Sequence, residues 1–185
     1  MNLDELAQKY GSDKSSKGHG YVKYYEQHFC SLKDLNLKIL ELGVREGWSM
    51  RMWHDYFPNS IICGIDNDLE NLCPASFEEE RIIFELGSQE DEKFLDEICT
   101  NYGPFDIVVD DASHISPLTI KSYQILFPRL KPGGIYVIED LHVCDYDKYY
   151  LPHGPSTLEF LKVISDNVES KKIYENKIAF IKKCL

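Results

Sequence analysis

The sequence predicts a doubly wound α/β fold, with a mostly parallel seven-stranded sheet that ends in a C-terminal antiparallel hairpin. Short runs rich in isoleucine and valine alternate with segments of helical periodicity along most of the chain. Such alternation is typical of a parallel sheet covered by helices on both faces. Two more strand-like runs lie close together near the C-terminal end, and these are expected to pair as the hairpin.

Five apolar runs have the length and composition of strands that are buried on both faces. Each is bounded by glycine, proline or aspartate, and together they form the parallel part of the predicted sheet. They are LKILELGV (37–44), SIICGID (60–66), IIFEL (82–86), FDIVVDD (105–111) and IYVIED (135–140).

Segments of helical periodicity separate these strands, at 48–57, 91–102 and 117–130. The last of them has Pro117 in its first turn and ends before a Lys-Pro-Gly-Gly sequence, which are common signals for the start and the end of a helix. One more helix is predicted over 156–169. The hairpin is predicted over 171–183, with its turn at Glu175 and Asn176.

The N-terminal part, residues 1–36, is expected to form two short helices that flank the loop YGSDKSSKGHGY (10–21). Residues 37–185 contain the predicted sheet. No linker, repeat or low-complexity tract divides the chain, so we expect one compact domain overall. A domain of 185 residues buries roughly 70 % of the surface that its unfolded chain exposes.

Composition excludes several classes of function. The chain has 20 Lys and Arg against 31 Asp and Glu, a net charge of -11. This charge disfavours a nucleic-acid partner, because proteins that bind nucleic acids neutralise phosphates with basic side chains. The six cysteines form no CxxC pair and are expected to be reduced thiols. No apolar run approaches the ~20 residues of a membrane span or resembles a signal peptide, so a cytoplasmic location is expected.

The ends of the first two strands indicate a nucleoside site. Ligands of open α/β sheets bind at the carboxyl ends of the strands, where Gly43 and Gly47 leave space close to the backbone. Asp66 ends the second strand, about twenty residues on, and can accept hydrogen bonds from ribose hydroxyls. Arg45 and Glu46 replace the middle of a G-x-G-x-x-G motif, which favours a nucleoside cofactor without phosphates.

Acidic residues end the fourth and fifth strands. If these strands are neighbours, Asp111 lies beside Glu139 and Asp140, and two carboxylates ~4 Å apart repel by about 4 kcal/mol at an effective dielectric constant near 20. A bound cation relieves this repulsion, and oxygen ligands favour a hard ion such as Mg²⁺. His114 follows Asp111 by three positions and is the candidate general base.

These motifs together resemble the class I S-adenosylmethionine-dependent methyltransferases, and more narrowly the small Mg-dependent sugar O-methyltransferases related to the macrocin and mycinamicin enzymes and to proteins labelled cephalosporin hydroxylases. The resemblance covers nearly the whole chain and implies a Rossmann-like methyltransferase fold. The motifs that carry it are YGSDK, HGYVKYYEQHF, ELGVREGWSMRMWHDYFP, GIDND, DDASH and IEDLH.

The resemblance also implies roles for individual residues. It implies that Asp111, Glu139 and Asp140 hold magnesium and that His114, with Asp111, performs the catalysis. Relatives often have Gly-Asp-Gln where this chain has Gly87-Ser88-Gln89, so Gln89 is the better candidate for an adenine contact. The residues implied to bind S-adenosylmethionine are Tyr10, Lys14, Glu41, Gly43, Gly47, Asp66, Ser88, Gln89 and Asp110.

The function that the resemblance implies is methylation of a sugar hydroxyl on a nucleotide sugar, a surface polysaccharide or a glycosylated natural product. The resemblance would fold the loop at 10–21, which includes Tyr21, over the cofactor as a lid, and a plain surface loop stays open as the alternative. His19 and His142 are candidate contacts to the substrate or the lid. Four aromatic residues at helical spacing are interpreted as packing: Trp48, Trp53, Tyr56 and Phe57.

Two alternatives stay open at this point. His114, His142 and an acid could form the two-histidine, one-carboxylate site of a non-haem iron oxygenase, although such sites usually occur in β-rich folds. The chain could also bind S-adenosylmethionine without catalysing transfer, because the loop at 141–155 offers little material for an acceptor pocket. A second copy of the chain, in a homo-oligomer, could supply the missing wall.

Overall fold

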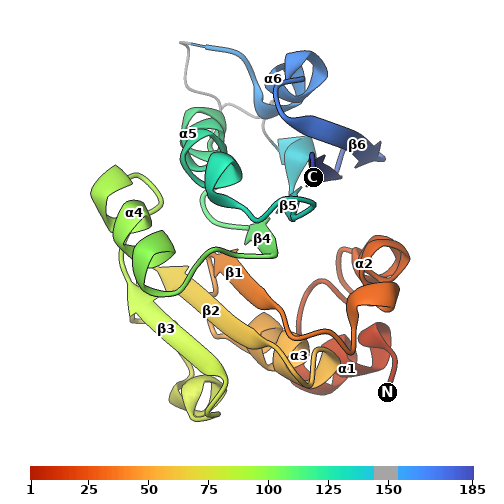
Figure 1. Cartoon of the computed structure of the whole chain (residues 1–185). Helices are drawn as coiled ribbons and strands as arrows, with labels where there is room; N and C mark the ends of the chain where they lie inside the picture. The colour runs from red at the N-terminus through yellow and green to blue at the C-terminus, as the bar shows by residue number, and fades with distance from the viewer. Residues whose placement is uncertain (144–153) are drawn as a thin grey trace.

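A computed structural model of the chain describes residues 1–143 and 154–185, so most of the loop at 141–155 lies outside the described residues. Figure 1 shows one twisted sheet with helices on both faces, as predicted. The strands are β1 (Lys38–Leu42), β2 (Ile61–Asp66), β3 (Ile82–Leu86), β4 (Ile107–Asp110), β5 (Ile135–Ile138), β6 (Val168–Tyr174) and β7 (Ile178–Lys183). The α-helices are α1 (Leu3–Tyr10), α2 (Val22–Phe29), α3 (Trp48–Tyr56), α4 (Glu92–Asn101), α5 (Ser116–Leu126) and α6 (Thr157–Val163).

The strand order is β3-β2-β1-β4-β5-β7-β6, and this order places the site. The first five strands are parallel, whereas β7 is antiparallel to both β5 and β6. The order reverses between β1 and β4, which is the position where open α/β sheets bind ligands. Asp110 pairs with Ile138 across β4 and β5, so the next residues along each strand, Asp111 and Glu139, leave the sheet side by side.

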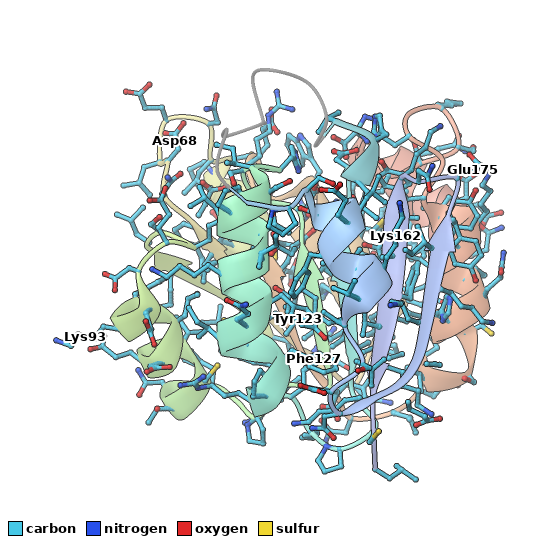
Figure 2. All side chains as sticks on the ribbon, turned by 90° about the horizontal axis from the view of Figure 1, so that it is seen from above. Asp68, Lys93, Tyr123, Phe127, Lys162 and Glu175 are labelled. Atoms are coloured by element: carbon cyan, nitrogen blue, oxygen red, sulfur yellow. The ribbon has the colours of Figure 1, made fainter. Side chains whose placement is uncertain are left out.

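Two apolar layers hold the helices on the sheet. On one face, α1, α2 and α3 pack on the strands, and Trp53, Tyr56 and Phe57 are fully buried there, as predicted from their spacing. On the other face, α4, α5 and α6 cover the sheet, as Figure 2 shows. The rings of Tyr123 and Phe127 stack at 4.7 Å in this second layer.

The N-terminal residues belong to the first apolar layer. Leu3, Leu6, Tyr25 and Phe29 are buried in the same cluster as Trp53 of α3. The helix α1 begins with a capping box from Asn2 and Glu5 and ends at Gly11 in the left-handed conformation, which are strong local signals for a helix. The first helices therefore fix the loop between them against the sheet.

The predicted helix over 156–169 is too long. The helix α6 ends at Val163, and Asn167 adopts a positive φ of 60° before β6 begins at Val168. Pairing of β6 with β7 determines the conformation there, and local helical periodicity does not report such pairing. The hairpin turn is placed correctly, because residues 175–177 connect β6 to β7 and both Glu175 and Asn176 have a φ of 52°, in the left-handed region that tight hairpin turns use.

The cysteines at five described positions are free, in line with the expectation of reduced thiols, and Cys144 lies outside the described residues. Among the helices that the structure describes, none is both long enough and apolar enough to cross a lipid bilayer.

Candidate functional site

A cavity of about 490 Å³ opens at the carboxyl ends of β1, β2 and β4, which is a typical volume for a small-molecule site. Its walls come from the loop after α1, the glycine turn after β1, the end of β2 and the loop after β4. Among the lining residues are Gly11, Ser12, Asp13, Lys14, Gly43, Trp48, Asp66, Asp68, Gly87, Gln89, Asp111, Ala112, Ser113, His114 and Asp140. In Figure 2, Asp68 and Glu175 lie toward the same end of the molecule.

The turn after β1 requires glycine at Gly43. Its φ is +80°, and a Cβ placed there would lie 2.4 Å from the backbone oxygen of Asp111. The Asp66 carboxylate accepts hydrogen bonds from the backbone N–H groups of Val44, at 2.9 Å, and Arg45, at 2.8 Å. Asp66 therefore fixes the turn while it also lines the cavity. A Cβ at Gly47, which has a φ of +82°, would meet Ser76 and Phe77.

Gln89 joins two walls of the cavity. Its side-chain oxygen accepts from the backbone N–H of Ser113 at 2.9 Å, and its side-chain nitrogen donates to the Ser122 hydroxyl at 2.9 Å. The loop after β4 is thereby held against the loop after β3. Ser88, the neighbouring candidate, is not one of the lining residues.

Four carboxylates at the ends of β1, β4 and β5, those of Glu41, Asp111, Glu139 and Asp140, are called the acid cluster below. The ammonium group of Lys14 is enclosed among three of them. It donates a very short hydrogen bond to Asp111, lies 3.0 Å from Glu139 and lies 3.5 Å from Glu41. The Lys14 side chain is only 1 % exposed. A residue of the N-terminal loop therefore provides the internal counterion of the acid cluster.

Two tyrosines from the same N-terminal segment contact the remaining carboxylate oxygens. The Tyr25 hydroxyl donates to Glu139, and the Tyr21 hydroxyl donates to Asp140. Both rings are fully buried. Each of these hydrogen bonds joins groups more than a hundred positions apart, so the acid cluster is completed only by tertiary packing.

Burial and mutual repulsion change the acidity of the cluster. Burial alone would lower the pKa of Lys14, but the carboxylates of Asp111, Glu139 and Glu41 hold that pKa well above its usual value. Burial, followed by the charge of Asp111, raises the pKa of Glu139 well above its usual value. Burial also raises the pKa of Glu41 to about 7. The cluster thus retains protons or cations at neutral pH.

Two carboxylates and one histidine converge at the cavity, and such a group could hold a divalent cation. Ligand atoms of Asp111, His114 and Asp140 lie within 4.8 Å of one another. Their side chains are 16 %, 22 % and 10 % exposed, whereas Glu139 is 1 % exposed behind Lys14. Two carboxylates open to the cavity fit a hard cation with free positions for oxygen ligands.

The backbone is strained at two of these three residues. His114 has a φ of 57° and Asp140 a φ of 53°, in the left-handed region that residues other than glycine rarely adopt. Such conformations occur most often where the surroundings fix a functional group. Nε2 of His114 lies 3.5 Å from Oδ2 of Asp140, so the two residues face one another across the cavity wall.

Two further histidines surround Asp140. Nδ1 of His19 lies 3.6 Å from Oδ1 of Asp140, and Nδ1 of His142 lies 3.8 Å from the same oxygen. The structure thus brings both candidate contact histidines to the edge of the acid cluster.

Some of the predicted cofactor residues lie away from the cavity. The Tyr10 hydroxyl donates to Asp55 on α3, and neither residue is among those that line the cavity. Glu41 and Asp110 are buried behind the lining residues. Glu41 accepts from Ser49, and Asp110 accepts from the Tyr136 hydroxyl at 3.1 Å.

Sequence reasoning does not indicate three features of the site. Tyr25 on α2 was not considered as a partner of Glu139, Trp48 was interpreted only as packing, and Lys14 was not expected to be the counterion of the acids. Trp48 is half-buried and lines the cavity. Its position as the first residue of α3, directly after the glycine turn, could have indicated its role.

Asp110 is expected to make the free energy of unfolding depend on pH. Burial raises its pKa to about 7 from a usual 3.8, although the Tyr136 hydroxyl partly offsets this. Between about pH 4 and pH 7 the folded chain binds a proton that the unfolded chain lacks, so stability falls as pH rises through that window. Asp110→Asn should flatten this decline in urea unfolding at pH 5 and pH 7 with a chelator present. Parallel slopes for the two proteins would contradict the assignment.

The chain is similar in sequence to known O-methyltransferases. No protein-family model matches the chain. It is 33 % identical to demethylmacrocin O-methyltransferase of Streptomyces fradiae, over 95 % of this chain and 46 % of that enzyme. It is 39 % identical to mycinamicin VI 2''-O-methyltransferase of Micromonospora griseorubida, over 93 % of this chain and 45 % of that enzyme. The chain thus spans about half the length of the curated relatives that it matches.

Solved structures of methyltransferases share the fold of this chain. The structure of the MycE methyltransferase from the mycinamycin biosynthetic pathway, in complex with Mg, SAH and mycinamycin VI, superposes with a TM-score of 0.90 and 33 % identity. The match covers 100 % of this chain and 55 % of that one. A putative O-methyltransferase from Klebsiella pneumoniae, at 12 % identity and a TM-score of 0.65, shares the fold alone.

Proposed function

We propose that this chain, which has the class I S-adenosylmethionine-dependent methyltransferase fold and is homologous to sugar O-methyltransferases, transfers a methyl group from S-adenosylmethionine to a sugar hydroxyl with the help of Mg²⁺. The observation that supports this most directly is the convergence of Asp111, His114 and Asp140 within 4.8 Å of one another. They lie at a cavity whose wall includes the glycine turn after β1. The relatives act on the sugars of glycosylated natural products, and we propose the same class of acceptor here.

The cofactor is proposed to occupy the part of the cavity between the glycine turn and β2. Gly43 leaves the backbone accessible, and Asp66 and Gln89 offer polar groups for the ribose and the adenine. Trp48 offers an aromatic face at the wall formed by α3. Ligand pockets of this size combine apolar walls with a small number of placed polar groups.

The acceptor hydroxyl is proposed to bind beside Asp111 and Asp140. These carboxylates would hold the magnesium ion, with Glu139 close behind them, and the bound ion would lower the pKa of the hydroxyl. Nε2 of His114 receives the hydroxyl proton, and Oδ2 of Asp140, 3.5 Å away, stabilises the resulting imidazolium. Asp111 orients the acceptor. Holding both reactants in one cavity supplies much of the remaining acceleration.

The geometry disfavours the iron oxygenase alternative. The described residues that converge within 4.8 Å are two carboxylates and one histidine, whereas the oxygenase site needs two histidines and one carboxylate. His142 lies 3.8 Å from Asp140 and is not part of this group. The chain also has an α/β fold with a mostly parallel sheet, whereas such oxygenases usually have β-rich folds.

The test measures methyl transfer from labelled S-adenosylmethionine to a panel of glycosylated natural products. We expect transfer with Mg²⁺, including under anaerobic conditions, and its loss on chelation with EDTA. Binding of S-adenosylhomocysteine should quench the fluorescence of half-buried Trp48 and not that of buried Trp53, so Trp48→Phe should lose the signal. Transfer that persists after exhaustive chelation would contradict the proposed metal role. Quenching without transfer to any acceptor would favour a chain that binds the cofactor and lacks chemistry.

A further inference from the structure

Lys14 occupies a position that would also attract a divalent cation. Its ammonium group lies among Asp111, Glu139 and Glu41, at the junction of β1, β4 and β5, and its side chain is 1 % exposed. A buried ammonium group is stable only when carboxylates surround it closely. The same carboxylates lie next to the proposed magnesium site, with Asp111 common to both.

We propose that Lys14 is a positioning residue that serves as a placeholder cation. It holds Asp111 and Glu139 in place while no divalent ion is bound, and it moves toward Glu41 when an ion binds. The second part of this inference rests on the proposed function, because it needs the metal site at Asp111 and Asp140. The first part, the pairing of Lys14 with Glu139, does not.

Glu41 provides the alternative partner. Its Oε2 accepts from the Ser49 hydroxyl at 2.8 Å, whereas its Oε1 is buried without a hydrogen-bond partner among the described residues. That oxygen forms only a long ion pair with the Lys14 ammonium, at 3.5 Å. A buried carboxylate oxygen without a donor is costly. A shift of the flexible Lys14 side chain would satisfy it and release Asp111 and Glu139.

Tyr25 keeps one oxygen of Glu139 fixed when Lys14 moves. Tyr25 donates to Oε1 of Glu139, while Lys14 donates to Oε2. The two donors therefore hold different oxygens of one carboxylate. When the ammonium group leaves, one oxygen of Glu139 becomes available and the other remains fixed by Tyr25.

The Lys14 ammonium group and a divalent ion are expected to compete for the same carboxylates. An ammonium group and a divalent ion on the same carboxylate repel, and the site is too buried for water to screen them. Metal binding and the Lys14 contacts are thus coupled. Removing the positive charge at position 14 should strengthen metal binding, although it weakens the metal-free fold.

The first measurement is thermal unfolding in EDTA of Lys14→Met, Glu139→Gln and the double variant. Lys14→Met should lower the Tm by roughly 6–12 °C, since it leaves buried charges without a partner, and adding Glu139→Gln should recover part of that loss. The control Lys9→Met should change the Tm little, because Lys9 is 45 % exposed in its ion pair with Asp55. An additive loss in the double variant would overturn the pairing.

The second measurement is calorimetric titration with Mg²⁺ alone. Lys14→Met should bind Mg²⁺ roughly tenfold more tightly than the unmodified chain, and Lys9→Met should bind it unchanged. If Lys14→Met does not fold, the double variant compared with Glu139→Gln should show the same increase. Equal or weaker binding would overturn the placeholder role. If neither the unmodified chain nor any variant binds Mg²⁺, the proposed function and the second part of the inference fail, and the pairing stands on the unfolding data.

Discussion

Replacing His114 with asparagine is expected to lower the rate of methyl transfer by roughly 10²–10⁴-fold, which is the usual contribution of a general base. The imidazole faces the cavity and lies 3.5 Å from Asp140. Asparagine is the better substitute, because His114 has a φ of 57° and asparagine tolerates this region well. The measurement is the single-turnover rate with labelled S-adenosylmethionine.

Binding data separate a catalytic role from a structural one. The His114→Asn variant should bind S-adenosylhomocysteine as the unmodified chain does, with the same quenching of Trp48. His54→Asn is a matched control, because His54 lies on α3, outside the residues that line the cavity. Loss of cofactor binding together with the rate would show that His114 supports the fold of the loop, and a rate within threefold of normal would remove it as the base.

Replacing Gly43 with alanine is expected to cause a large loss of stability, because this position combines a φ of +80° with backbone atoms that leave no room for a Cβ. The alanine Cβ would lie 2.4 Å from the Asp111 backbone oxygen and 2.6 Å from Cα of Ala112, and backbone atoms cannot rotate away. Left-handed strain costs roughly 1–2 kcal/mol, and overpacking adds about 1–3 kcal/mol. The Tm should fall by roughly 10 °C.

Gly20 provides the control for this second prediction. Its φ is +71°, close to that of Gly43, but a Cβ there would meet nothing within 4 Å. Gly20→Ala should therefore show the conformational strain alone, roughly 1–2 kcal/mol. If the two variants unfold at the same temperature, the close approach of the glycine turn to the end of β4 does not matter for stability.

The sheet could be predicted from the sequence because its central strands are continuous apolar runs with clear ends. The run 82–86 matches β3 at both ends, and β4 and β5 lie within their predicted ranges. Strand ends also located the acids, since parallel neighbours bring their carboxyl ends to one edge of the sheet. The proximity of Asp111 to Glu139 thus follows from local pattern and topology.

The partners of the acids could not be predicted in the same way. Lys14 belongs to a polar loop, and its side chain reaches Glu139 only because α1 and α2 pack on the apolar layer that contains α3. Tyr25 lies among other aromatic residues of α2, and sequence spacing does not show which hydroxyl reaches a buried carboxylate. Tertiary packing decides these contacts, as it also decides where α6 gives way to β6.

The internal counterion has a consequence for how the chain is made. Lys14 and Glu139 are 125 positions apart, and a ribosome that adds about 5–20 residues per second needs roughly 6–25 s to synthesise that stretch. During this interval the ammonium group and the hydroxyl of Tyr25 have emerged while their carboxylate does not yet exist. The earliest part of the site to leave the ribosome is therefore among the last to be secured, and proteolysis of nascent chains should find it accessible until β5 has been translated.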